Sequence, residues 1–210
     1  MKKFSVYFVL LTFSLAFGLS FMSCGGGGSN KESPASDFTY VRMQGGDRIG
    51  ITRYNGNGGK VVIPSVIEDL PVTVIGNNAF AGQDDNQYFP ANNITEIVIP
   101  NSVVTIGMNA FYWNDNLRSV TLPNGLKDLP SNAFASCENL TTVNLPESLE
   151  RIGALAFYEC GKLANLTIPS SLTGITFSEF MGINSAFDGC QKLPNRTRQR
   201  LQELGYTGSF

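Results

Sequence analysis

The sequence of 210 residues contains no histidine, and this absence excludes several classes of catalytic site. Without an imidazole, no Ser-His-Asp or Cys-His arrangement can form, and zinc or iron would have no nitrogen ligand of the usual kind. The chain also has no phosphate-binding loop, no nucleophile motif and no paired carboxylates beyond ordinary surface acids. The sequence therefore predicts a protein that is not an enzyme and that has no cofactor and no metal site.

Charge is scarce as well. Charged residues make up 15% of the chain, and the formal net charge is −2. Nucleic-acid binding needs a concentrated cationic stripe or patch, and none stands out, so we expect no nucleic-acid partner. The length by itself suits one or two domains.

The N-terminal segment has the order of a secretory signal. Two lysines precede an apolar and small-residue run over residues 4–22. A charged start before an apolar stretch is typical of a signal peptide, although about 18 apolar residues also approach the length of a membrane-spanning helix. Residues 21–24, Phe-Met-Ser-Cys, resemble a loose bacterial lipobox, which implies that Cys24 becomes the lipidated first residue. An uncleaved membrane anchor with an incidental cysteine is the alternative.

Composition then divides the chain into three segments. We predict a lipoprotein signal peptide over residues 1–23 and a flexible Gly/Ser-rich tether over residues 24–37. Glycine-rich stretches behave as flexible coils, which gives a lipid-anchored domain slack. Residues 38–210 are predicted to form one repeat domain with its caps.

Four prolines spaced 23 residues apart mark an internal repeat: Pro100, Pro123, Pro146 and Pro169. The units align as L-x-x-V-x-I-P-x-x-L-x-x-I-G-x-x-A-F-x-x-C. A fixed period in the twenties is typical of a leucine-rich repeat solenoid, whose stacked rungs share one core. We predict an α/β solenoid of about five 23-residue rungs, each with one short strand and a short helical or turn segment.

The apolar phase of the repeat predicts the parts of each rung. The opening half alternates and is β-rich, proline ends the strand because it lacks a ladder donor, and Ile-Gly marks a second short extended piece. A hairpin near residues 38–52 and a helix over residues 195–204, stopped by Gly205, are the expected caps. Five phenylalanines in phase should stack into an apolar spine: Phe80, Phe111, Phe134, Phe157 and Phe187.

The motif I-P-x-x-L-x-x-I-G-x-x-A-F-x-x-C closely resembles the BspA-like (treponemal-type) leucine-rich repeats of bacterial surface proteins. The resemblance covers about residues 38–193, and Leu129-Pro130 in place of Ile-Gly is a departure from it. It implies a secreted or surface-attached, non-catalytic protein. With the lipid anchor at Cys24, we expect attachment to the bacterial outer membrane at the cell surface. Attachment on the periplasmic face of that membrane is the alternative. Some members of the family bind host matrix proteins. The resemblance therefore implies a protein or glycan ligand, and host matrix proteins are among the candidates.

Three cysteines share one repeat position, three residues after the phenylalanine: Cys137, Cys160 and Cys190. We predict buried free thiols, since an unpaired cysteine behaves as a small hydrophobe. A secreted protein also invites a disulfide between Cys137 and Cys160. Neighbouring rungs lie about 4.8 Å apart, whereas disulfides need Cβ atoms about 3.8 Å apart, so that bridge would be awkward.

The strand positions that should face outward are mostly small, polar and uncharged, and they are our first candidate ligand-binding set: Glu96, Val98, Ser119, Thr121, Thr142, Asn144, Asn165 and Thr167. The concave face of a solenoid is its usual binding surface, and such side chains suit an extended peptide or a glycan. The alternative is that they are solvated strand residues, with threonine favoured by β propensity.

Aromatic residues form a second candidate set. Tyr112 and Trp113 follow one phenylalanine of the repeat, and an insertion over residues 81–93 adds Tyr88 and Phe89. Aromatics are enriched in binding surfaces, and long loops on rigid scaffolds often carry function. Alternatively, the loop aromatics pack the insertion against its own rung. A structural or assembly component of the envelope, without an external ligand, is the competing function.

Overall fold

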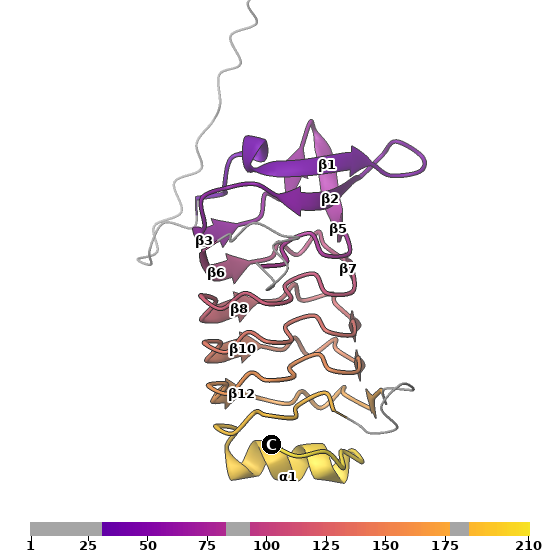
Figure 1. The fold of residues 1–210 in the computed structure, drawn as a ribbon. Helices are drawn as coiled ribbons and strands as arrows, with labels where there is room; N and C mark the ends of the chain where they lie inside the picture. The colour runs from indigo at the N-terminus through magenta and orange to yellow at the C-terminus, as the bar shows by residue number, and fades with distance from the viewer. Residues whose placement is uncertain (1–30, 83–92, 177–184) are drawn as a thin grey trace, which may run out of the picture.

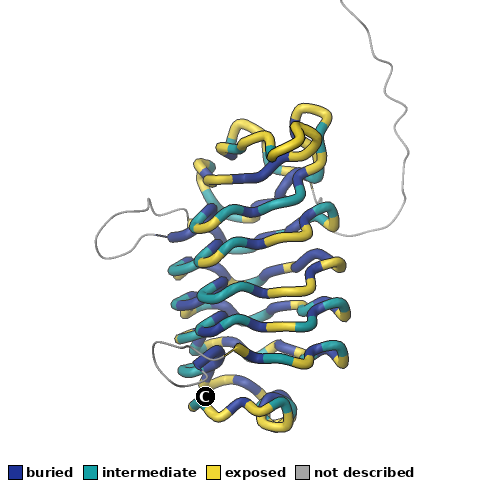
Figure 2. The backbone as a smooth tube through the Cα atoms, turned by 90° about the vertical axis from the view of Figure 1, so that its right-hand side faces the viewer, coloured by how far each residue is buried: buried dark blue, intermediate teal, exposed yellow. Residues whose placement is uncertain are grey.

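Each 23-residue unit of sequence forms one turn of a solenoid, and the turns stack in chain order (Figure 1). The computed structural model describes residues 31–82, 93–176 and 185–210. Tyr88 and Phe89 lie outside these ranges. The tube in Figure 2 alternates between buried and exposed positions along every turn, as strands with one core-facing side require.

Two parallel ladders run along the stack. The first ladder has strand order β12-β10-β8-β6-β3 and comes from the β-rich opening half of each unit. Its strands are β3 (Gly59–Val62), β6 (Ile94–Val98), β8 (Ser119–Thr121), β10 (Thr142–Asn144) and β12 (Asn165–Leu166). The second ladder comes from the Ile-Gly positions and is in two parts: β7 pairs with β5, and β9, β11 and β13 form a separate sheet further along the stack. Its strands are β5 (Leu70–Ile75), β7 (Thr105–Ile106), β9 (Asp128–Leu129), β11 (Arg151–Ile152) and β13 (Gly174–Ile175).

The repeated proline separates the two strands of each rung, as predicted. The carbonyl of Pro123 accepts a hydrogen bond from the amide of Leu126 at 3.2 Å, and Pro146 and Leu149 form the equivalent bond at 3.0 Å. Proline lacks a ladder donor, so the chain leaves the first sheet there and enters a tight turn. The departure Leu129-Pro130 does not interrupt the pattern, because Asp128–Leu129 still forms strand β9.

The segment that closes each described rung consists of turns, which is one of the two forms that the sequence predicted for it. Asn109, Asn132 and Leu155 share one repeat position and have φ of 58°, 56° and 59°. A left-handed residue interrupts an α-helix. The amide of Phe134 also donates to the carbonyl of Ala156 on the next rung at 2.8 Å. These amides link rungs and therefore cannot form helical hydrogen bonds.

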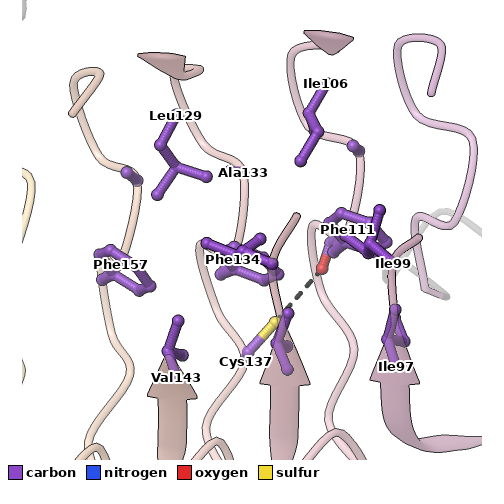
Figure 3. Packing of buried hydrophobic residues seen from close by; sticks show 14 of the residues in the cluster. Ile97, Ile99, Ile106, Phe111, Leu129, Ala133, Phe134, Cys137, Val143 and Phe157 are labelled. Carbon is purple, nitrogen blue, oxygen red and sulfur yellow. Dashed lines mark hydrogen bonds between the residues drawn. The ribbon is translucent and has the colours of Figure 1, made fainter. Parts of the chain in front are cut away.

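The predicted phenylalanine spine is confirmed. All five rings are at most 1% exposed. Ring centroids of Phe111 and Phe134 are 5.1 Å apart, and those of Phe134 and Phe157 are 5.6 Å apart, with the rings nearly parallel. Figure 3 shows these rings between the apolar side chains of the second ladder, such as Leu129, and those of the first, such as Val143. Burial of one such side chain stabilises the fold by about 1.5–3 kcal/mol.

Cys137, Cys160 and Cys190 are buried and free, as predicted, so the alternative disulfide between Cys137 and Cys160 is not formed. The thiol of Cys137 donates to the carbonyl of Phe111 at 3.2 Å, drawn as a dashed line in Figure 3. Burial raises the pKa of the Cys137 thiol to about 12, because a thiolate in the core would be desolvated. Asn114 occupies the same repeat position one rung earlier, and its Nδ2 donates to the carbonyl of Phe80 at 2.7 Å.

The N-terminal cap is the predicted hairpin: β1 (Phe38–Arg42) pairs antiparallel with β2 (Ile49–Tyr54), and β2 joins β5 of the second ladder. Leu70 and Pro71 belong to a small hairpin in which β4 (Val66–Ile67) pairs with the start of β5. Its turn residues Glu68 and Asp69 both have positive φ. Glu68 accepts hydrogen bonds from Arg42 and Tyr40, which fixes this hairpin to β1.

The ordered domain begins before the predicted boundary at residue 38. A short 3₁₀ helix covers Ala35–Asp37, and Ser33 exchanges hydrogen bonds with the backbone of Val62. The carboxylate of Glu32 accepts from the amide and hydroxyl of Ser65 at 3.0 Å. Residues 32–37 therefore belong to the first rung, and the tether prediction for residues 24–37 is wrong over this part.

The C-terminal cap is the predicted helix, α1 (Asn195–Glu203), which lies across the last rung (Figure 1). Gly205 follows it with φ of 87°, a conformation that ends helices. Leu201 is fully buried, and Tyr206 packs edge-on against Phe187, the last ring of the spine, at 5.7 Å. The helix therefore covers the apolar end of the stack.

Candidate ligand-binding face

The outward positions of the first ladder lie on one continuous sheet face, which we call the polar face. Register places Glu96, Ser119, Thr142 and Asn165 side by side in one row. A second row contains Val98, Thr121 and Asn144, and it continues in repeat phase to Thr167. The structure therefore brings together every strand residue of the first candidate set.

The pleat explains why these side chains point outward. Val120, Val143 and Leu166 alternate with them and are at most 4% exposed in the core. Successive side chains of a strand point to opposite sides of a sheet, so the intervening residues must face solvent. Thr121, Asn144, Asn165 and Thr167 are exposed, and the remaining members of the rows are half-buried.

The polar face is uncharged in both rows from β8 to β12. Its side chains are hydroxyls and amides, and one pair is linked: Asn165 Nδ2 donates to Thr142 Oγ1 at 3.2 Å. Glu96 differs from the rest, because its carboxylate lies 3.1 Å from the ammonium of Lys60 on β3. Glu96 therefore forms an ion pair at the N-terminal end of the face and contributes no isolated charge.

The second ladder presents a different surface. Arg151 on β11 forms an ion pair with Asp128 on β9, and its Nη2 donates to Asp128 Oδ2 at 2.8 Å. Lys127 and Glu150, immediately before these strands, form another pair at 3.0 Å. Charges here are satisfied between neighbouring rungs, whereas the rows of the polar face leave hydroxyls and amides available for a ligand.

The described members of the aromatic set lie apart from the polar face, in the turn segment of their rung. The rings of Tyr112 and Trp113 are half-buried and meet edge to face, with centroids 5.3 Å apart. Gly82 packs against them: its amide donates to the carbonyl of Tyr112 at 2.7 Å, and a Cβ there would lie 1.8 Å from the carbonyl oxygen of Trp113. Tyr112 and Trp113 therefore do not belong to the polar face.

Sequence reasoning missed a groove at the C-terminal end of the polar face. It consists of two adjoining hollows of about 620 and 410 Å³ between β12 and α1, which we call the C-terminal groove. Both hollows are lined by Thr167 and Arg196. Arg196 and Arg200, four positions apart on a predicted helix, were the available signal, because that spacing puts them on one side of the helix.

Two kinds of site have no representative in the part of the chain that the structure describes. It contains no cluster of three or more carboxylate or thiol side chains arranged to hold a metal ion. Across residues 31–82, 93–176 and 185–210, no helix combines the length and apolar character needed to cross a bilayer. The apolar run over residues 4–22 lies outside these ranges.

Comparison with known proteins identifies the repeat. Residues 73–185 match the family model described as a BspA type leucine rich repeat region, with six copies. The chain belongs to this family. The match covers more than half of the 210 residues and includes β6 to β13 of the two ladders.

Solved structures of bacterial leucine-rich repeat proteins are similar to this BspA-type chain. The leucine-rich repeat protein TpLRR of T. pallidum is 29% identical, with a TM-score of 0.66, over 86% of this chain and 99% of its own. A leucine-rich repeat protein of Bacteroides ovatus is 28% identical, with a TM-score of 0.57, over 69% of this chain and 37% of its own.

A third similar structure is the pneumococcal vaccine antigen PcpA, which is 25% identical, with a TM-score of 0.50. The match covers 66% of this chain and 38% of that protein. This chain therefore spans the whole of TpLRR but less than half the length of the other two proteins. No curated protein matches it.

Proposed function

We propose that this BspA-type protein is a non-catalytic, lipid-anchored lipoprotein that uses its polar face to bind a protein or glycan ligand outside the cell. The observation that carries the proposal is the contrast between the two ladders. On the second ladder, charged side chains are paired with each other, as in the ion pair Asp128–Arg151. The rows of the polar face instead present uncharged hydroxyls and amides over β8, β10 and β12. Rigid, extended solenoid faces are the usual binding surfaces of repeat proteins.

Binding by this face can be tested with a bulky charge placed at its centre. Thr121→Arg puts a long cationic side chain between Val98 and Asn144 in the second row. The matched control is Thr173→Arg, because Thr173 is an exposed threonine beside the second ladder. The full-length protein, purified in detergent, would be screened against arrays of matrix proteins and glycans. We expect Thr121→Arg to abolish binding and Thr173→Arg to leave it unchanged.

Lipid anchoring is tested separately at Cys24. Growth with an alkyne fatty acid should label the wild-type protein and should not label a Cys24→Ala variant. Cys137→Ala is the matched control, because Cys137 is buried in the core and cannot accept a lipid. Labelling of Cys24→Ala would contradict the anchor.

Exposure outside the cell distinguishes ligand binding from a structural role in the envelope. Protease added to intact cells should cleave the repeat domain, while a periplasmic marker remains protected. A repeat domain that becomes sensitive only after the outer membrane is breached would instead support an assembly component on the periplasmic face.

A further inference from the structure

The C-terminal groove exists because α1 takes the place of the next strand of the first ladder. Leu193 repeats the role of Leu163, since each donates its amide to the cysteine carbonyl three residues earlier, at 3.2 and 3.0 Å. After Leu193 the chain enters α1 at Pro194 instead of continuing as a strand. A helix cannot follow the outline of a flat strand, so a gap remains between it and β12.

Helical spacing then decides which side chains face this gap. Thr197 and Leu201 are buried, and Thr197 Oγ1 donates to the carbonyl of Leu166 on β12 at 3.0 Å. Arg196 and Arg200, also four positions apart, line the hollow on the side toward Thr167. Glu203 lines the same hollow, so two arginines face one carboxylate there. The groove therefore adds a small net positive charge to the end of the uncharged polar face.

The arginines of the groove are available to a ligand. Arg196 is exposed, and its side chain forms no hydrogen bond or ion pair with any residue that the structure describes. Arg200 lies 3.4 Å from Glu203, and both side chains are at least 40% exposed, which makes a weak pair. Arg198 behaves differently, because it donates to the carbonyls of Leu193 and Gln191 at 2.9 and 2.7 Å. Arg198 holds the cap together, and Arg196 is free of that role.

The remaining lining combines hydroxyl and amide side chains with aliphatic ones. Thr167 and Ser170 border the larger hollow, and Asn144 and Asn165 border the smaller one. No aromatic ring lines either hollow. Peptide recognition depends strongly on aromatic anchors in pockets, which this groove does not offer, since its apolar lining, such as Leu145 and Ile168, is aliphatic. A ligand with many hydroxyl groups and one anionic group matches the lining better, because arginine forms paired hydrogen bonds with a carboxylate.

We propose that the C-terminal groove binds an acidic sugar of a glycan, with Arg196 as the partner of the sugar carboxylate. This inference rests on the proposed function, because it assigns a ligand class to the end of the same polar face. The rest of the glycan then extends from Thr167 along the rows toward Ser119. The combined hollows are large enough for small-molecule ligands, which occupy sites of about 300–1,000 Å³.

The test uses two pairs of oligosaccharides that differ in charge: 3′-sialyllactose with lactose, and trigalacturonate with its carboxyl-reduced form. Binding to the full-length protein in detergent would be measured by calorimetry. At least one acid should bind more tightly than its neutral partner. Arg196→Gln should weaken that binding by roughly 10- to 100-fold, since a hydrogen bond to a charged group is worth about 1.5–3 kcal/mol.

The matched control is Arg118→Gln, because Arg118 is an exposed arginine next to β8 and outside the groove. It should bind the acid as the wild type does. Equal binding of acid and neutral sugars, equal effects of the two arginine variants, or tighter binding of an oligoglutamate peptide than of either acid would each overturn the proposal. Unchanged melting temperatures of both variants show that the fold is intact.

The outcomes also separate this inference from the proposed function. If neither acid binds but Thr121→Arg abolishes binding of another ligand, the acidic-sugar site is wrong and the polar face still functions. If Arg196→Gln removes binding of the acidic sugar while Thr121→Arg affects no ligand, the groove is a binding site and the polar face is not.

Discussion

The thiol of Cys160 donates a hydrogen bond to the backbone carbonyl of Phe134, 26 residues earlier, with Sγ and oxygen 3.1 Å apart. Cys137 and Cys190 make the same contact with the carbonyls of Phe111 and Phe157. The repeated cysteine therefore links the turn segment of one rung to the preceding rung. It fills a core position and satisfies a buried carbonyl at the same time.

This geometry predicts unreactive thiols. Cys137, Cys160 and Cys190 are all 0% exposed, so a maleimide should label none of them in the native protein and all three in denaturant. Mass spectrometry of peptides from the two conditions provides the measurement. A disulfide between peptides that contain two of these three cysteines, or fast labelling of any of the three in the native protein, would contradict the structure.

Stability should decrease in alkaline solution. Burial raises the pKa of Cys137 and of Cys190 from 9.0 to about 12, so between these values the unfolded chain releases protons that the native chain retains. The contribution of these thiols to stability is complete below pH 9. As the pH rises from 9 to 12, each thiol lowers the unfolding free energy by about 1.4 kcal/mol per pH unit. Urea unfolding from pH 8.5 to 10.5 should show a shallower slope for Cys137→Ala than for the wild type. Equal slopes would exclude a contribution from this thiol.

Asn114 takes over the cysteine role in its rung, which predicts an order among its variants. Its Nδ2 donates to the carbonyls of Phe80 and Phe111 at 2.7 and 2.9 Å, while its Oδ1 is buried without a partner among the described residues. Asn114→Ala should lower stability by about 1–3 kcal/mol, because the buried carbonyls lose a donor. Asn114→Cys should lower it less, since it restores the thiol found in later rungs. Equal losses would mean that the donor is unimportant.

The aromatic spine is the clearest test of the core. Phe134 is 0% exposed and stacks between the rings of Phe111 and Phe157. Phe134→Ala should lower the unfolding free energy by about 3–5 kcal/mol, because it opens a cavity between rungs. Chemical denaturation would measure this against Thr173→Ala on the surface, which should change stability by less than about 0.5 kcal/mol. An unchanged midpoint for Phe134→Ala would contradict the stacking.

The repeated glycine after the second strand is required by the close approach of two rungs. A Cβ at Gly153 would lie 2.4 Å from the backbone nitrogen of Ser131. Backbone cannot yield as a flexible side chain does, so Gly153→Ala should lower stability by about 1–3 kcal/mol or more. At Gly125 a Cβ meets nothing within 4 Å, and Gly125→Ala should leave stability unchanged or raise it by about 0.4–1 kcal/mol. Thermal unfolding of the two variants gives the comparison, and equal melting temperatures would refute it.

The ladders could be predicted because their signals are local. Alternation at Val120 and Val143 identified the buried side of each strand, and the 23-residue spacing placed Thr121 beside Asn144. The turn segments could not be predicted in the same way. Their form depends on the hydrogen bond from Phe134 to Ala156 on the next rung and on the positive φ of Leu155, and neither has a reliable local pattern.

The candidate site divides along the same line. Both rows of the polar face follow from repeat phase, so the sequence predicted their members. The C-terminal groove joins Thr167 to Arg196, which are far apart in the chain and out of phase with the repeat. The boundary near residue 38 failed for a similar reason, because Ser33 is held by a backbone contact to Val62.

The sequence by itself determined the period, the buried positions, the five-ring spine and the side of each strand that faces solvent, because a repeat imposes the same local pattern on every rung. Tertiary structure decided what happens between and beyond the rungs. Stacking used the backbone amides for inter-rung hydrogen bonds, and this decided for turns where the sequence had left a helix or a turn open. The end of stacking at Leu193 brought α1 against β12 and left the groove that contains Arg196.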